Sequence, residues 1–79
     1  MYKITKVEAT DPTSKFVKVG EERIGGYIEE SLKVGSRLYF THGSRYLLTS
    51  IIKKISDHPT DENTKVITTT YSVYHLTKL

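Results

Sequence analysis

Short runs of alternating apolar and polar residues, separated by turns that contain glycine or proline, dominate the chain. The clearest run is Arg37–Thr41, in which Leu38 and Phe40 share one face of a strand while Tyr39 lies on the other. Short strands broken this often by turn residues are typical of a β-barrel or a β-sandwich. We therefore expect strands at about residues 2–8, 16–19, 23–29, 37–41, 46–55, 65–72 and 73–78.

Three places predict irregular backbone. The glycine pair at 25–26 lies inside a strand pattern, which indicates a bulge or a sharp bend at a barrel corner. In the first strand Val7 is out of phase with the apolar residues before it, which predicts a bulge near residues 5–6. The sequence His-Gly-Ser at 42–44 predicts a hairpin turn.

The segment 46–55 fits two structures. Its apolar residues lie at 47, 48, 51, 52 and 55, a spacing that an amphipathic helix would show, with Ser44 as the N-cap. A strand with the same residues needs a bulge near 49–50. The β-branched run after Leu48 and the preceding turn favour the strand.

The predicted fold is all-β, a small and strongly bent antiparallel barrel of five or six strands, similar to SH3-like barrels. A helix at 44–56 would instead make the fold α+β. A chain of 79 residues has room for one domain, 1–79, and buries only about 60% of the surface of its unfolded form. A thin core with many strand edges also predicts a homodimer. The expected core residues are Ile4, Val7, Val19, Ile24, Ile28, Leu32, Leu38, Phe40, Leu48, Ile52, Val66 and Leu76.

Charge is unevenly distributed along the chain. The net charge is +3, yet residues 33–54 carry five basic side chains and no acid, between two acidic stretches. A basic block of this kind attracts polyanions, or it is simply a solvated face. Proteins that mimic DNA are disfavoured, because they present dense negative charge.

The sequence offers few groups for catalysis. There is no cysteine, so disulfides and thiolate metal sites are excluded, and the three histidines lack metal-ligand spacing. The serines and glycines fit neither a nucleophile elbow nor a phosphate-binding loop. We therefore expect no enzyme, no cofactor and no metal. No apolar run is long enough for a membrane span or a signal peptide, so the expected location is cytoplasmic.

Tyrosines interleaved with basic residues are the remaining functional signal. Such surfaces stack nucleobases and follow phosphates, and tyrosine and arginine are also common anchors of protein interfaces. The expected partners are therefore a protein or, as the alternative, a nucleic acid or nucleotide. The predicted binding residues are Arg37, Tyr39, Arg45, Tyr46, Lys53 and Lys54.

Four short motifs occur in order: Gly26-Tyr27-Ile28, Leu32-Lys33-Val34-Gly35, Leu47-Leu48-Thr49-Ser50-Ile51-Ile52 and Ser72-Val73-Tyr74-His75-Leu76. Over residues 24–77 the chain resembles small β-barrel proteins encoded by bacteriophages, a group without a characterised activity. The resemblance implies an accessory protein in the host cytoplasm that inhibits or modulates a host or defence protein by direct contact. It transfers no functional residues.

Overall fold

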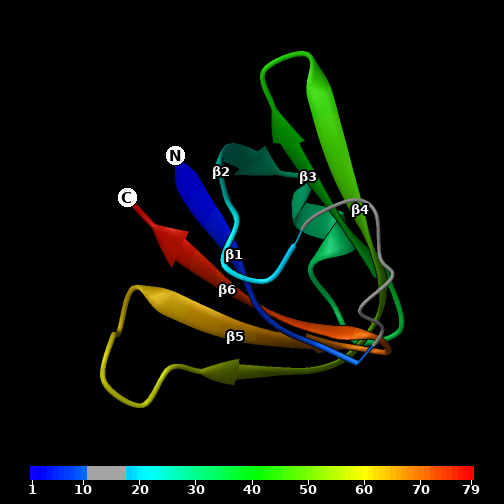
Figure 1. Cartoon of the computed structure of the whole chain (residues 1–79), viewed down its shortest axis with the longest axis vertical. Coiled ribbons are helices and arrows are strands. Elements are labelled where there is room, and N and C mark those ends of the chain that lie inside the picture. The colour runs from blue at the N-terminus through cyan, green and yellow to red at the C-terminus, as the bar shows by residue number, and fades with distance from the viewer. Residues whose placement is uncertain (11–17) are drawn as a thin grey trace.

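The computed structural model describes residues 1–10 and 18–79, which form a closed antiparallel barrel (Figure 1). Each strand pairs with the next in sequence, and the last strand returns to pair with the first. The strands are β1 Tyr2–Ala9, β2 Glu22–Tyr27, β3 Arg37–His42, β4 Arg45–Asp57, β5 Thr64–Thr69 and β6 Ser72–Lys78, with a short 3-10 helix, η1, at Glu29–Ser31. The prediction of an all-β antiparallel barrel is confirmed, with six strands.

The helical alternative for residues 44–56 is wrong, because they belong to β4 and to the turn before it. The first half of β4 pairs with β3 and the second half with β5. The β3–β4 register shifts by one residue between the pairs Arg37–Ile51 and Tyr39–Leu48. This bulge lies at residues 49–50, where the strand interpretation required it, and it explains why the apolar spacing imitates a helix.

The hydroxyl of Thr49 replaces the ladder hydrogen bond that the bulge disrupts. Thr49 is 2% exposed, and its Oγ1 accepts a hydrogen bond of 3.0 Å from the amide of Leu38. The same hydroxyl donates to the carbonyl oxygen of Ser50 at 2.8 Å. One side chain therefore satisfies two backbone groups beside the core.

Replacing Thr49 with valine is expected to lower the free energy of unfolding by about 1–3 kcal/mol. Valine keeps the shape of threonine but leaves the buried Leu38 amide without its acceptor. Urea denaturation will measure the difference. The control is Thr68→Val, because Thr68 is half-buried on β5 and its hydroxyl has no partner among residues 1–10 and 18–79. Equal stability of the two variants would show that the Thr49 hydroxyl is dispensable.

The core differs from the expected one in phase and membership. Leu38, Phe40 and Ile52 are each 0% exposed, as expected, whereas Leu48 is 44% exposed and points outward. Expected core residues Val19, Ile24 and Ile28 are also exposed. The buried apolar cluster consists of Ile4, Leu38, Phe40, Leu47, Ile52, Ile67, Tyr74 and Leu76, with Tyr2, Tyr27, Leu32 and Ile55 packed against it.

The glycine pair lies at a barrel corner, as predicted. Gly25 is the last residue of β2 that pairs with β1, and Gly26 is the first that pairs with β3. The two backbones approach so closely here that a Cβ on Gly25 would lie 1.9 Å from the carbonyl oxygen of Thr41. Glycine at position 25 therefore allows β2 to change partners.

The turns and remaining bulges follow the sequence with small displacements. Gly43 has φ +64° at the first position of a two-residue turn, and Ser44 has a negative φ, which fits a type II′ hairpin. The bulge in β1 lies at Val7, just beyond the expected position. The strand expected at 16–19 falls largely outside the described residues, and 18–19 are not part of a strand.

Candidate functional site

The outward side of β3 is defined by its two most buried residues. Leu38 and Phe40 are 0% exposed and point into the barrel. Because side chains alternate along a strand, Arg37, Tyr39 and Thr41 point outward. The outward row of β3 therefore has a tyrosine at its centre.

The outward row of β4 lies directly beside it. In the β3–β4 register Tyr46 faces Thr41, and Leu48 faces Tyr39. Directly opposed residues share a face, so Tyr46 and Leu48 also point outward. The rings of Tyr39 and Tyr46 stack at a centroid distance of 5.2 Å with an interplanar angle of 12°. Tyr46 is nevertheless 63% exposed, so its ring is largely open to a partner.

Aliphatic side chains continue this surface on both sides of the tyrosines. The amide of Ile28 donates to the carbonyl oxygen of Tyr39 at 2.9 Å, which places Ile28 beside β3. Ile28 is 47% exposed, and Ile51, which faces Arg37, is 39% exposed. We call the outward side chains of Ile28, Arg37, Tyr39, Tyr46, Leu48 and Ile51 the hairpin face.

A serine hydroxyl holds one side of the hairpin face in place. The amide of Tyr39 donates to Oγ of Ser31 at 3.0 Å, and this hydroxyl donates in turn to the carbonyl oxygen of Ile28. Ser31 ends η1. The relay replaces a direct ladder bond and fixes η1 and Ile28 against β3.

The predicted binding residues divide into three groups. Arg37, Tyr39 and Tyr46 lie together on the hairpin face. Arg45 faces His42 across the two-residue turn, and this pair has the same phase as Phe40 and its partner Leu47. Arg45 is therefore exposed at the hairpin tip but points to the opposite side from the stacked tyrosines.

Lys53 and Lys54 form the third group, at the base of the hairpin. The β4–β5 register shifts by one residue between Ile52 and Lys54, so a second bulge falls at Lys53. Both lysines are exposed. Lys53 follows the outward Ile51 by two residues, which places its charge at the lower margin of the hairpin face.

The basic side chains of the hairpin are not neutralised by neighbouring acids. Among residues 1–10 and 18–79, the ion pairs are Lys3–Glu22, Arg23–Glu21 and Lys65–Asp57, none of which involves residues 33–54. The five basic residues of that stretch consequently produce an uncompensated positive potential around the hairpin.

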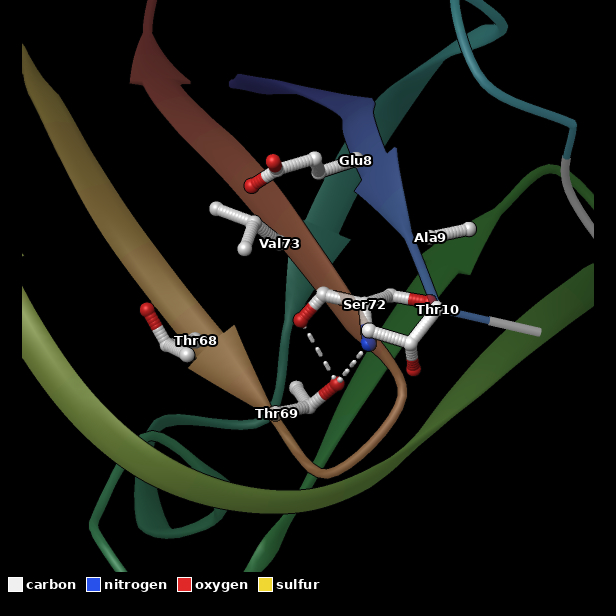
Figure 2. A pocket seen from close by; sticks show the side chains of 7 residues that line it. All are labelled: Glu8, Ala9, Thr10, Thr68, Thr69, Ser72 and Val73. Atoms are coloured by element: carbon white, nitrogen blue, oxygen red, sulfur yellow. Dashed lines mark hydrogen bonds between the residues drawn. The ribbon is translucent and has the colours of Figure 1, made fainter.

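A small cavity lies at the other side of the molecule, between the end of β1 and the β5–β6 turn (Figure 2). Its volume is about 170 Å³. The Thr69 hydroxyl donates to the carbonyl oxygen of Ser72 at 2.9 Å and accepts from its amide at 3.1 Å, so this hydroxyl is fully used within the turn. Glu8 is the titratable residue of the lining, which offers no acid–base pair.

A second cavity, of about 190 Å³, lies at a mouth of the barrel between Tyr2, Tyr27 and Lys78. The two tyrosine rings meet edge to face at a centroid distance of 5.0 Å. Burial and the neighbouring Tyr2 raise the pKa of Tyr27, so its phenol stays protonated at neutral pH. The cavity is mainly a space beside the core and carries no nucleophile.

Two histidines meet on the outer surface of the sheet. The rings of His58 and His75 are 5.0 Å apart and edge to face. His58 Nδ1 accepts hydrogen bonds from the amides of Thr60 and Asp61, at 3.2 and 3.1 Å. Burial, and then the charge of His58, lower the pKa of His75. Within the described residues no group of three or more side chains could hold a metal ion.

The hairpin register was the signal that sequence reasoning missed. A two-residue turn at 43–44 pairs Phe40 with Leu47, which puts Leu48 on the hairpin face and Arg45 on the other side. Ile28 and Ile51 were missed because exposed aliphatic residues resemble core residues in a sequence.

The chain matches no protein-family model, no curated protein and no solved structure. The part of the chain that the structure describes contains no helix long and apolar enough to cross a membrane.

Proposed function

We propose that this protein is a non-enzymatic binding module that contacts a protein partner through the hairpin face. The observation that carries the proposal is the stack of Tyr39 and Tyr46 with exposed aliphatic residues around it. The partner class is a host or defence protein that the chain inhibits or modulates, as expected of a phage-type accessory protein.

The composition of the hairpin face favours a protein over a nucleic acid. Leu48, Ile28 and Ile51 are 44%, 47% and 39% exposed. Aliphatic side chains gain free energy when a partner covers them, at roughly 25 cal/mol per Å² of apolar surface, but they do not stack on bases as aromatic rings do. A tyrosine stack with an arginine beside it and an apolar surround is the composition of a protein-binding anchor.

Binding of a nucleic acid or nucleotide is the second candidate. It is supported by the open ring of Tyr46 and by the basic residues of the hairpin, which have no ion pair among residues 1–10 and 18–79. Phosphate binding weakens steeply as salt rises, whereas a contact built on tyrosine and aliphatic residues does not. The salt dependence of binding therefore separates the two candidates.

The test combines a variant with a matched control. The immobilised protein is used to capture partners from a bacterial host lysate, and captured proteins are identified by mass spectrometry. The double variant Tyr46→Ala with Leu48→Ser is expected to weaken capture by about tenfold or more, since anchors of this kind contribute over 1.4 kcal/mol. Ile24→Ser is the control, because Ile24 is 55% exposed but lies on β2, where it pairs with β1.

The outcomes are distinct once both variants are shown to melt at the temperature of the parent. Capture that is lost in the double variant and kept in the control supports the hairpin face. Capture that is unchanged in both variants contradicts it. Capture of nucleic acid alone, abolished by salt, would favour the second candidate.

A further inference from the structure

The first half of β4 has a neighbouring strand on one side only. Residues 45–51 pair with β3, whereas pairing with β5 begins at Ile52. Figure 1 shows the β3–β4 hairpin projecting from the rest of the barrel. Within residues 1–10 and 18–79, no strand pairs with the other edge of β4 over residues 45–50.

The backbone groups of Tyr46 and Leu48 point toward this edge. Leu48 faces Tyr39, and both the amide and the carbonyl of Tyr39 bond on the η1 side, to Ser31 and Ile28. Tyr39 and Leu48 are therefore a pair without mutual hydrogen bonds, so the amide and carbonyl of Leu48 point away from β3. Tyr46 has the same phase. Two amides and two carbonyls are thus available at alternate positions.

The β5–β6 turn limits the length of the edge. The amide of Thr70 donates to the carbonyl oxygen of Ile51 at 3.0 Å, and the amide of Tyr71 donates to Oγ of Ser50 at 3.3 Å. The edge is therefore open from Arg45 to about Ser50. This length is close to that of an ordinary strand, roughly five or six residues.

The charges around the edge lie at its two ends. Arg45 is at the hairpin end, and Lys53 and Lys54 lie just beyond the other end. The central stretch from Tyr46 to Thr49 carries no charge. Exposed edges are usually protected by a charge or a proline within the strand, and this edge has neither at its centre.

We propose that the free edge of β4 binds an extended, acidic peptide segment of a partner protein as an added strand. The amides and carbonyls of Tyr46 and Leu48 hydrogen-bond to the backbone of the segment, and their side chains contact its apolar residues. Acidic residues of the segment lie beside Arg45 at one end and beside the lysines at the other. The inference rests on the proposed function in that the partner is a protein, and it specifies how that partner binds.

A second copy of the chain is a poorer occupant. Antiparallel pairing of two such edges brings Arg45 of each copy toward the lysines of the other. Both copies carry the same positive charge, and residues 33–54 hold no acid that could compensate it. An acidic segment brings the complementary charge instead.

The experiment uses a defined peptide rather than an unidentified protein. The probe is a synthetic peptide of about eight residues in which valine and glutamate alternate, with blocked ends. Added to the isotopically labelled protein, it is expected to shift the amide resonances of Tyr46 and Leu48 and to slow their hydrogen exchange. A second peptide carries N-methyl groups on the amides that face the edge, and a third has lysine in place of glutamate. Both are expected to bind about tenfold more weakly or worse.

Two variants test the backbone separately from the side chain. Leu48→Pro removes the edge-facing amide, and proline is tolerated at such an edge position. Leu48→Ala removes the side chain and keeps the amide. Stronger loss of peptide binding in the proline variant than in the alanine variant supports strand addition, provided that both variants melt near the parent temperature.

The remaining outcomes overturn the inference in distinguishable ways. If the N-methylated peptide binds as well as the unmodified one, the edge is not used, while contact through the hairpin face survives. If no peptide shifts the Tyr46 and Leu48 amides, an added acidic strand is excluded even where lysate proteins are captured. If these amides are protected only as protein concentration rises, with a doubled mass in light scattering, the occupant is a second copy.

Discussion

Alanine at position 25 is expected to destabilise the protein severely, by about 3 kcal/mol or more, because it forces two backbones apart. Its Cβ would lie 1.9 Å from the carbonyl oxygen of Thr41, whereas Cβ atoms essentially never approach a neighbour closer than 3.0 Å. The obstacle is a backbone atom in the β2–β3 pairing, so no side-chain rotation relieves it. Small domains have a free energy of unfolding of roughly 5–15 kcal/mol, so the loss is a large fraction of the total.

Gly26→Ala is the matched control for this prediction. A Cβ on Gly26 meets nothing within 4 Å, and its φ is not positive. Alanine there restricts the unfolded chain and is expected to leave the stability unchanged or to raise it by about 0.4–1 kcal/mol. Thermal and urea denaturation of the two variants provide the comparison. Similar stabilities would show that β2 does not pass as close to β3 as described.

Ile52→Ala is expected to lower the free energy of unfolding by about 2–5 kcal/mol. Ile52 is 0% exposed, and it lies where β4 changes its partner from β3 to β5. Its removal leaves a cavity among residues that both halves of the barrel share. In so small a core, the neighbouring side chains have little freedom to fill it.

Ile51→Ala provides the control at the adjacent position. Ile51 is 39% exposed on the hairpin face, so its truncation is expected to change the stability by less than about 1 kcal/mol. Denaturant unfolding of both variants at one temperature measures the difference. If Ile51→Ala were the more damaging of the two, the assigned direction of the β4 side chains would be reversed.

The strands could be predicted where alternation is unbroken, and less well beside bulges. In β3, Leu38 and Phe40 are buried as their phase requires. In β4 the bulge at residues 49–50 reverses the phase, so Leu47 and Ile52 are both buried although one number is odd and the other even. A helix shows the same spacing, and only the partner strand resolves the two.

The candidate site was harder to predict than the fold, because its residues depend on register. Tyr39 and Tyr46 could be placed near one another from a hairpin turn alone. The outward direction of Leu48, and the opposite direction of Arg45, follow only when the turn is known to have two residues. Tyr74 was missed for a different reason, since tyrosine is common both in cores and on surfaces.

The pairing of β1 with β6 makes completion of the barrel a late event in synthesis. β1 emerges first from the ribosome, yet its partner over most of its length is the last strand of the chain. Until β6 has been translated, that edge of β1 has no permanent partner, while the β3–β4 hairpin needs only local contacts to form. Nascent chains are therefore expected to hold an early hairpin and an open edge that chaperones or neighbouring chains can bind. Sites of slow translation near residues 72–78 would lengthen this interval.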